Sequence, residues 1–519
     1  MHPKQPASRP VPAAAALATL TLAAAFLLAS CATVCKDTGG AVAAKPSQWT
    51  YAAEPHPHIT HSSGGWTLRV IVVGSSSNLI VTSAARHPDA PAAPPLSDPV
   101  SGGMRVTAIG DMAFAGCTNL MSADIPAGVT AIGGRAFRDC VGLTDVDIPS
   151  SVTSIGDGAF LNCRDLTGMD IPLGITRVSD GAFGNCTGLK RVTIPPGVTS
   201  IGKMAFSRCT GLTGMTIPPG VTSIGDGAFR GCASLTGVIL PPSVTGIGDG
   251  AFDNCAGLTG VILPPGLASI GERAFRGCTG LAGMTIPPGV TSIGWEAFRG
   301  CTRLASVDIP ASLASIEKWT FFDCTGLTSV TIPSGVTSIG WEAFRGCSGL
   351  TSVTLSPGLS SIGDRAFARC AGLTNVTLSS GLANIGDKAF ALCTGLANVA
   401  LPAGVTGIGR ETFRGCTGLT SVDFPPGITY IGDRVFHGCI GLTRMGIPPG
   451  VTGIGRETFR GCTGLTSVDF PPGITYIGDG AFDGCASLTD VTIPPGATHI
   501  SRGAFPPHTR VIRLEAKRD

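Results

Sequence analysis

A 23-residue unit recurs along most of the chain without insertion or deletion, and one copy runs from Thr213 to Leu235 as TGMTIPPGVTSIGDGAFRGCASL. A Phe marks each copy from Phe114 to Phe505, and a Cys follows three residues later in every copy but the last. No single copy can bury its own apolar residues, so neighbouring copies must stack. The sequence therefore predicts a solenoid, whose function is expected on an extended surface rather than in a catalytic cleft.

Within each copy, the apolar pattern predicts a strand, a sharp turn, a short extended piece and a helical turn. Met215 and Ile217 alternate with polar residues, which is typical of a strand with one buried face. The following Pro218–Gly220 predicts a type II turn, in which the Gly takes a positive φ. After the extended piece Val221–Gly225, the Ala, Phe and Cys have helical-turn spacing, and Asp226 is a candidate cap.

The predicted fold class is therefore an α/β repeat solenoid of short parallel strands, turns and short helical turns. It spans residues 105–505, or about 17–18 rungs at one rung per copy. Residues 31–64 are rich in Ala, Gly, Pro and Ser without a period, which predicts a flexible tether. Two β-rich runs in residues 65–104 predict an N-terminal cap, and residues 506–519 predict a last strand and a charged tail.

Residues 1–30 have the features of a signal peptide. Lys4 and Arg9 precede an apolar run over residues 13–29, too short for a stable membrane span. The run ends in Leu-Ala-Ser-Cys, which resembles the bacterial lipobox and implies lipidation at Cys31. Acyl chains at Cys31 would anchor the exported chain to a membrane. The alternative is an ordinary signal peptide followed by a Cys at that position by chance.

The composition argues against several functions. The chain has 36 basic and 34 acidic residues, so no charge excess predicts a nucleic-acid partner. The recurring polar residues appear once per copy, which marks them as parts of the scaffold. The sequence contains no phosphate-cradling loop, supported nucleophile or HExxH motif. We therefore expect a protein that is not an enzyme and needs no cofactor.

Seventeen of the 19 Cys residues occupy one position of the repeat at 23-residue spacing. No CxxC pair or regular His accompanies this row, so a zinc site is poorly supported. Buried free thiols that pack as small hydrophobic groups are the favoured interpretation. Some disulfides between neighbouring rungs remain an alternative in an exported protein.

The motif IPxGVTSIGxxAFxGCxxLxxV, repeated over about four-fifths of the chain, resembles the BspA-like, treponemal class of leucine-rich repeat. The resemblance implies a leucine-rich-repeat superhelix. It also implies a bacterial secreted or surface protein, often a lipoprotein, and some members of the class resemble adhesins for host matrix proteins or other bacteria.

The candidate binding residues lie where the unit departs from its own pattern. Three consecutive rungs carry Trp295, Trp319 and Trp341 just before the Ala-Phe pair or its equivalent. The residue after the Phe is often Arg, as at Arg299 and Arg345. Neighbouring rungs would place these residues in one patch, and Trp and Arg favour contacts with proteins. The alternative is that each Trp merely covers its own turn.

These features together predict a cell-surface lipoprotein, on the outer membrane or cell surface, whose solenoid binds a protein partner. The resemblance implies that the partner is a host matrix protein or a bacterial surface protein, and that the role is adhesion. A module that captures a glycan or small ligand on the Trp residues is one alternative. A variable surface antigen without a specific ligand is another.

Overall fold

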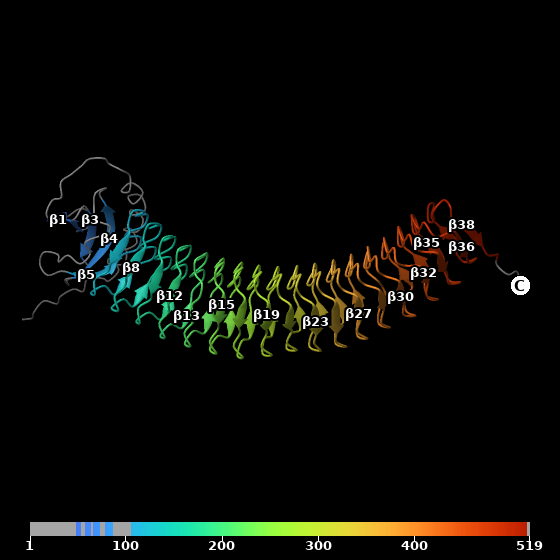
Figure 1. Ribbon diagram of the computed structural model, residues 1–519, viewed down its shortest axis with the longest axis horizontal. Coiled ribbons are helices and arrows are strands. Elements are labelled where there is room, and N and C mark those ends of the chain that lie inside the picture. Colours follow the sequence, from blue (N-terminus) through green and yellow to red (C-terminus); the bar gives the residue numbers. More distant parts are fainter. Residues whose placement is uncertain (1–47, 53–57, 64–65, 73–77, 87–104, 516–519) are drawn as a thin grey trace, which may run out of the picture. The chain divides into compact units, whose positions relative to one another are not determined.

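The computed structural model describes residues 48–52, 58–63, 66–72, 78–86 and 105–515 (Figure 1). The chain divides into two compact units, Met1–Cys163 and Arg164–Asp519. Strands and turns build both units, and the described residues contain no helix. The predicted signal peptide and Cys31 lie outside the described residues.

The first unit begins with antiparallel strands and continues into the repeats. Strands β1 to β4 pair in sequence order, and β4 then pairs in parallel with β5, which starts the series β5-β7-β9. Strands β1 and β2 fall within residues 31–64, which the sequence predicts as a tether. The strands of this unit are β1 (Gln48–Ala52), β2 (His58–Ser63), β3 (Trp66–Val72), β4 (Asn78–Arg86), β5 (Arg105–Ile109), β6 (Ser122–Asp124), β7 (Ala131–Ile132), β8 (Asp145–Asp147) and β9 (Ser154–Ile155).

The second unit stacks its rungs in chain order, and its strands form two rows (Figure 1). The row of longer strands consists of β10 (Gly168–Asp170), β12 (Arg191–Thr193), β15 (Gly237–Ile239), β17 (Gly260–Ile262), β19 (Gly283–Thr285), β21 (Ser306–Asp308), β23 (Ser329–Ile332), β25 (Ser352–Leu355), β27 (Asn375–Thr377), β29 (Asn398–Ala400), β30 (Ser421–Asp423), β32 (Arg444–Gly446), β34 (Ser467–Asp469), β36 (Asp490–Ile493) and β38 (Arg510–Arg513). The row of two-residue strands consists of β11 (Arg177–Val178), β13 (Ser200–Ile201), β14 (Ser223–Ile224), β16 (Gly246–Ile247), β18 (Ser269–Ile270), β20 (Ser292–Ile293), β22 (Ser315–Ile316), β24 (Ser338–Ile339), β26 (Ser361–Ile362), β28 (Asn384–Ile385), β31 (Tyr430–Ile431), β33 (Gly453–Ile454), β35 (Tyr476–Ile477) and β37 (His499–Ile500).

Both rows pair in parallel, and almost every pair has a register of one repeat. In the longer row, Val238 pairs with Val261 and both side chains are buried, while their neighbours in the strand face out. This alternation is the one expected of a strand with one buried face. The predicted parallel-strand solenoid is therefore confirmed.

The predicted helical turn is not found. The segment before each Cys contains two residues in the left-handed region, as at Glu296 (φ 57°) and Gly300 (φ 73°). These residues, and the Phe between them, donate their N–H groups to carbonyl oxygens of the next rung instead of to their own turn. Asp226 does not cap a helix either, because its carboxylate accepts the N–H of Asp249 in the next rung at 3.1 Å. We call this stretch the turn segment.

The predicted type II turn is also wrong. The N–H of Val221 donates to the carbonyl of Pro218 at 3.1 Å, so a turn closes there, but Gly220 does not have a positive φ. A Cβ at Gly220 would lie 3.2 Å from the carbonyl oxygen of Val198 in the preceding rung. The close approach of two rungs, rather than an unusual φ, accounts for the Gly at this position.

The core consists of residues stacked in register. Neighbouring Phe rings lie face to face, as in Phe206 and Phe229, whose centroids are 5.5 Å apart. The repeat cysteines donate their S–H groups to the carbonyl of the Phe one rung earlier, for example Cys232 to Phe206 at 3.1 Å. All seventeen repeat cysteines are buried, and those such as Cys209 and Cys232 are free thiols. Burial raises the pKa of Cys209 to about 12, so the thiol form persists at neutral pH.

Candidate binding surface on the turn segments

Each turn segment has three positions at which residues of different charge and size occur. They are the first left-handed residue, the residue after the Phe, and the second left-handed residue. In the rung of Phe344 these are Glu342, Arg345 and Gly346. The Ala and Phe between the first two positions and the Cys after the third are fully buried in this rung. Differences between rungs therefore occur at these three positions and at the residue before the first of them, which is Trp341 in this rung.

Four rungs carry a buried Glu at the first left-handed position. They are Glu296, Glu342, Glu411 and Glu457. Glu296 shows how such a charge is held: Arg299 of the same rung donates to it at 2.9 Å and Arg273 of the preceding rung at 2.7 Å. A buried carboxylate needs such partners because its desolvation would otherwise be costly. These Glu residues therefore fix the Arg side chains that lie over the turn segments.

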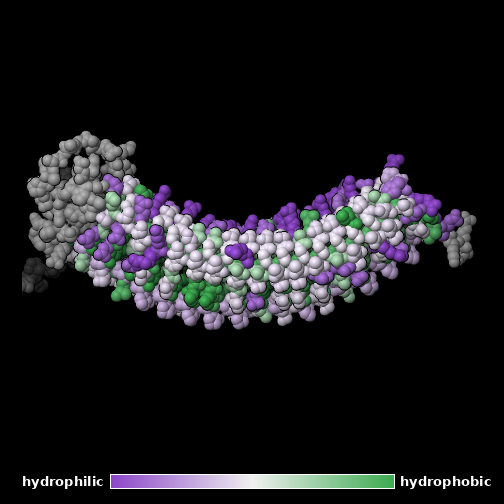
Figure 2. Space-filling model, in the orientation of Figure 1, coloured by the Kyte–Doolittle hydropathy of each residue, from purple (hydrophilic) through white to green (hydrophobic). Residues whose placement is uncertain are grey.

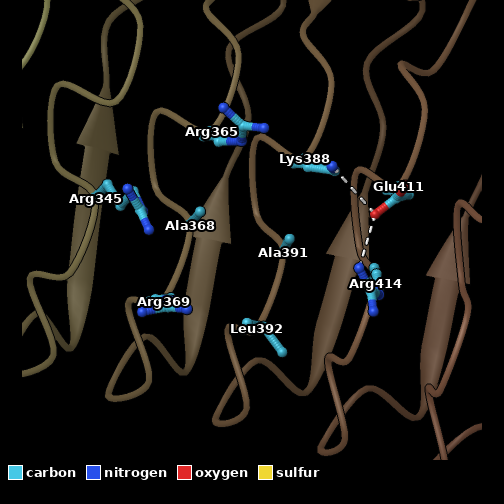
Figure 3. A pocket seen from close by; sticks show the side chains of 9 residues that line it. All are labelled: Arg345, Arg365, Ala368, Arg369, Lys388, Ala391, Leu392, Glu411 and Arg414. Carbon is cyan, nitrogen blue, oxygen red and sulfur yellow. Dashed lines mark hydrogen bonds and ion pairs between the residues drawn. The ribbon is translucent and has the colours of Figure 1, made fainter.

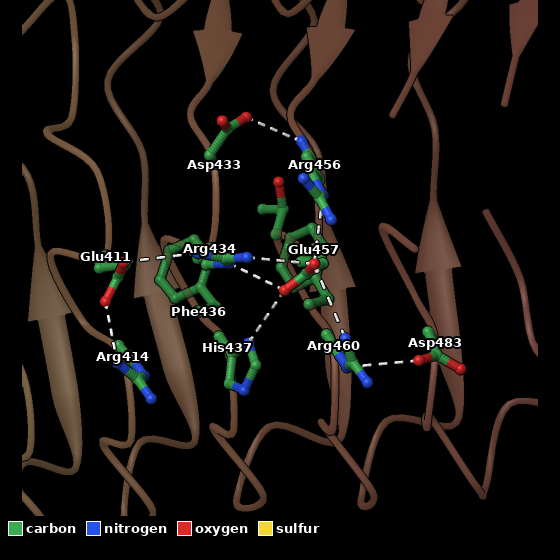
Figure 4. A network of polar contacts seen from close by, with 12 residues as sticks. Glu411, Arg414, Asp433, Arg434, Phe436, His437, Arg456, Glu457, Arg460 and Asp483 are labelled. Atoms are coloured by element: carbon green, nitrogen blue, oxygen red, sulfur yellow. Dashed lines mark hydrogen bonds and ion pairs between the residues drawn. The ribbon is translucent and has the colours of Figure 1, made fainter. Parts of the chain in front are cut away.

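The network around Glu457 is the densest of these arrangements (Figure 4). Arg434 of the preceding rung donates to it at 2.8 Å, Arg456 lies at 3.2 Å, and Arg460 lies at 3.7 Å and also pairs with Asp483. The hydrogen bond from Arg434 is the main reason that the pKa of Glu457 falls to about 2. The carboxylate therefore stays ionised well into the acidic range.

The three predicted Trp residues come together on the turn segments. The ring centroids of Trp295 and Trp319 are 6.0 Å apart, and those of Trp319 and Trp341 are 4.6 Å apart. The ammonium of Lys318 lies 4.0 Å from the centroid of the Trp295 ring. Trp319 occupies the first left-handed position, where its neighbours have Glu, and its indole N–H donates to Glu342 at 3.1 Å. Trp341 is the most open of the three, at 38% exposed.

Arg299 and Arg345 lie on both sides of Phe322, which takes the position after the Phe in the intervening rung. Their guanidinium carbons are 4.7 and 5.2 Å from the centroid of the Phe322 ring. We call this group of six side chains the aromatic–arginine cluster. Its members are Trp295, Trp319, Trp341, Arg299, Phe322 and Arg345.

A hollow of about 140 Å³ begins at Arg345 and extends to Arg414 (Figure 3). Its floor is formed by Ala368 and Ala391, which hold the position after the Phe in two successive rungs. We call it the basic hollow, because five of its nine lining residues are cationic. The lining residues are Arg345, Arg365, Ala368, Arg369, Lys388, Ala391, Leu392, Glu411 and Arg414.

The outer face of the longer strands carries an uncharged patch, seen as a green area over β15 in Figure 2. Ile239 and Ile262 pair in register there and are 66% and 61% exposed. Beside them lies a row of glycines at the same position of four successive rungs: Gly214, Gly237, Gly260 and Gly283. A Cβ on any of these four would meet no atom closer than 3.9 Å, so packing does not require Gly. The patch has no charge that would select a partner.

The comparisons with known proteins agree with this geometry. A family model described as BspA type leucine rich repeat region matches residues 101–213, 199–328, 315–439 and 384–511. The chain belongs to this family. A leucine-rich repeat protein from Bacteroides ovatus ATCC 8483 has a similar structure, with 26% identity and a TM-score of 0.56 over 86% of this chain and 98% of that one.

A leucine rich cell surface protein from Faecalibacterium prausnitzii A2-165 also matches, with 26% identity and a TM-score of 0.34 over 83% of this chain and 94% of that one. No curated protein matches this chain. BspA-type leucine-rich repeats are general scaffolds for protein interaction, and no catalytic family is indicated.

Across residues 105–515 and the described strands before them, no group of three or more His, Cys, Asp or Glu residues could hold a metal ion. Of the residues that the structure describes, none form a helix with the length and hydrophobicity to cross a membrane.

The structure thus brings Trp295, Trp319 and Trp341 together and places Arg299 and Arg345 beside them. The sequence analysis missed the buried Glu residues, Phe322 and the basic hollow. Two signals for them exist in the sequence. Glu recurs three residues before an Arg in several copies, and two successive copies have Ala where the neighbouring ones have Arg.

Proposed function

We propose that this BspA-type protein is a lipid-anchored surface protein that binds a protein partner through the aromatic–arginine cluster, in host-matrix or cell–cell adhesion. The observation that carries the proposal is the packing of three Trp rings over neighbouring rungs and of Arg299 and Arg345 on Phe322. Glu342 accepts hydrogen bonds from both Trp319 and Arg345 and so joins the two groups. Trp and Arg are the residues that most often dominate the binding energy of protein interfaces. Ion pairs to Glu296 and Glu342 hold Arg299 and Arg345 in place, so little side-chain entropy is lost on binding.

The arrangement of the rings favours a protein over a glycan. Trp319 packs against both other indoles, and Lys318 covers one face of Trp295. Trp341 therefore offers the most exposed ring, at 38% exposed. A sugar-binding site generally needs an open ring face, whereas a protein interface can use the edges of partly buried rings together with the Arg side chains.

Binding is tested on purified protein with arrays of matrix proteins, bacterial surface proteins and glycans. We expect a protein ligand, and we expect the Trp341→Ala and Phe322→Ala variants to weaken its binding about tenfold or more, as for central interface residues. The matched control is Tyr476→Ala, which removes an exposed aromatic side chain elsewhere on the solenoid and should bind normally. Binding of glycans alone, or undiminished protein binding by both cluster variants, would contradict the proposal.

The anchor is tested in cells. Metabolic labelling with a radioactive fatty acid should mark the wild-type protein and not the Cys31→Ser variant, because the acyl chains are attached at that thiol. Protease added to intact cells should then digest the repeats if they face outward. Labelling of Cys31→Ser, or full protection of the repeats from protease, would contradict this part of the proposal.

A further inference from the structure

The basic hollow exists because the row of Arg side chains is interrupted. The position after the Phe holds Arg345, then Ala368 and Ala391, and then Arg414 in four successive rungs. Two long side chains are replaced by methyl groups that are 5% and 6% exposed. The interruption leaves an apolar floor between cationic walls (Figure 3).

The charges around the hollow do not balance. Glu411 pairs with Arg414 at 3.0 Å and Lys388 at 3.5 Å, and Glu342 outside the lining pairs with Arg345 and Arg365. Asp323 also interacts electrostatically with Arg345 and Arg369, although it forms no ion pair with Arg369. The five cations of the lining therefore face three carboxylates, Glu342, Glu411 and Asp323, which leaves an excess of two positive charges.

Leu392 closes one side of the hollow in an unfavourable conformation. It occupies the second left-handed position with a φ of 63° and is 43% exposed. The next rung has Gly415 at this position. Every rung with a repeat Cys has a left-handed residue at this position, so the exposed apolar side chain, rather than the backbone conformation, sets Leu392 apart. Exposed apolar groups are a recurring property of binding sites.

An apolar floor below a cationic rim fits a side chain that has methylene groups and ends in a carboxylate. We propose that the basic hollow binds a Glu or Asp side chain from an acidic segment of the protein partner, with its methylene groups against Ala368, Ala391 and Leu392. Arg345 belongs to both the hollow and the aromatic–arginine cluster, so one partner can contact both. That the acidic segment belongs to a protein partner rests on the proposed function. A sulfated glycan would satisfy the cations but would leave the apolar floor without a contact.

The direct test uses the full chain and a short fluorescein-labelled peptide with two Glu residues on either side of a Leu, followed by fluorescence anisotropy. The Ala391→Arg variant fills the hollow and adds a positive charge. Arg is native at this position in other rungs, as at Arg345, so the variant should fold. We expect it to weaken peptide binding about tenfold, as for loss of a central contact. Stronger binding would show non-specific charge attraction and would overturn the proposal.

The contribution of charge is tested with Arg369→Asn. Asn is native at the equivalent position of another rung, Asn254, which also has a positive φ. We expect peptide binding to weaken about threefold to tenfold, with a smaller dependence on salt. The matched control is Arg208→Asn, because Arg208 holds the same position in a rung outside the hollow. Equal losses in the two variants would overturn a specific site.

Two further measurements separate this inference from the proposed function. The first measurement uses a heparin fragment as a second probe. If heparin binds the wild-type protein more tightly than the peptide does, and Ala391→Arg strengthens heparin binding, the hollow binds a glycan and the proposal is overturned.

The second measurement uses the Trp341→Ala variant. It should keep full affinity for the peptide while it loses affinity for the protein partner. Peptide binding that survives in Trp341→Ala supports the hollow even if no protein partner of the cluster is found.

Discussion

The network around Glu457 and the basic hollow next to Glu411 have nearly the same local sequence. The first is a closed set of ion pairs, whereas the second is an open hollow with a cationic lining. Residues 405–433 and 451–479 are identical, so Glu411 and Glu457 have the same neighbours within their own rungs. The rungs before and after them differ. Glu457 follows Arg434, which donates at 2.8 Å, while Glu411 follows Lys388 at 3.5 Å, next to the two-alanine gap. The adjacent rungs therefore decide whether a repeated Glu closes a network or borders a hollow.

The largest expected effect comes from removing the carboxylate of the closed network. Glu457→Gln leaves the guanidinium groups of Arg434, Arg456 and Arg460 without their shared partner. We expect a loss of about 2 kcal/mol in local stability, below the range for fully buried pairs because the Arg side chains are partly exposed. Glu411→Gln should cost less, since its ion pair to the preceding rung is longer, 3.5 Å to Lys388 against 2.8 Å from Arg434 to Glu457. Hydrogen exchange of the amides in the affected rungs measures both, and an equal loss in the two variants would contradict the difference between the regions.

Acidification should affect the closed network in a defined range. The pKa of Glu457 is lowered from its ordinary value of 4.5 to about 2 in the folded state, so its ionised form stabilises the fold. This stabilisation is fully present above about pH 4.5 and is lost as the pH falls toward 2. Hydrogen exchange or circular dichroism followed from pH 6 to 2 should show a decline in wild-type protein that Glu457→Gln lacks. Parallel pH profiles would contradict the prediction.

A smaller change is expected at the wall of the hollow. Leu392→Gly should stabilise the protein by up to about 1 kcal/mol, because Gly adopts a left-handed conformation without strain. The same variant should weaken binding of the acidic peptide, since the wall is lost. The control Asn254→Gly should change stability little, because Asn already tolerates this conformation. Thermal unfolding together with anisotropy measures both effects, and a destabilised Leu392→Gly would show that Leu392 serves the fold.

The smallest effects should come from the exposed Arg residues of the duplicated rungs. Arg410 lies 3.5 Å from Glu411 and Arg456 lies 3.2 Å from Glu457, and their side chains are 54% and 58% exposed. Such ion pairs contribute little because water screens them, so Arg410→Gln and Arg456→Gln should each cost about 0.5 kcal/mol or less. Denaturant midpoints of the two variants test this. A large effect at Arg456 alone would mean that the network depends on its outer members.

The sequence predicted the parts of the fold that depend on period. The 23-residue spacing fixed which residues stack, and it brought Trp295, Trp319 and Trp341 together. It could not reveal the left-handed residues, because Glu, Arg, Trp and Gly all occur at that position and no single residue type marks it. The spacing of Ala, Phe and Cys fits a helical turn as well as the turn segment, and only the hydrogen bonds to the next rung distinguish them.

The basic hollow was missed for a different reason. It results from two Ala side chains at the position after the Phe, where the neighbouring rungs have Arg. In the sequence, an Ala next to a buried Phe is typical of ordinary core packing. Its cations come from four rungs and from different positions of the repeat, so they form no motif along the chain. The Trp and Arg residues of the cluster were predicted because they are conspicuous additions to the pattern.

The thiol hydrogen bonds of the core have a consequence for how such a chain resists oxidation. The S–H groups of thiols such as Cys324 and Cys370 are donated to Phe carbonyls, and burial raises the pKa of both thiols to about 12. Only the thiolate attacks a disulfide, so a folded rung is nearly inert to oxidants. The unfolded chain has no such protection, and its regularly spaced thiols could crosslink in many wrong combinations. Stacking of each rung on its neighbour then protects the thiols from wrong disulfides in addition to forming the fold.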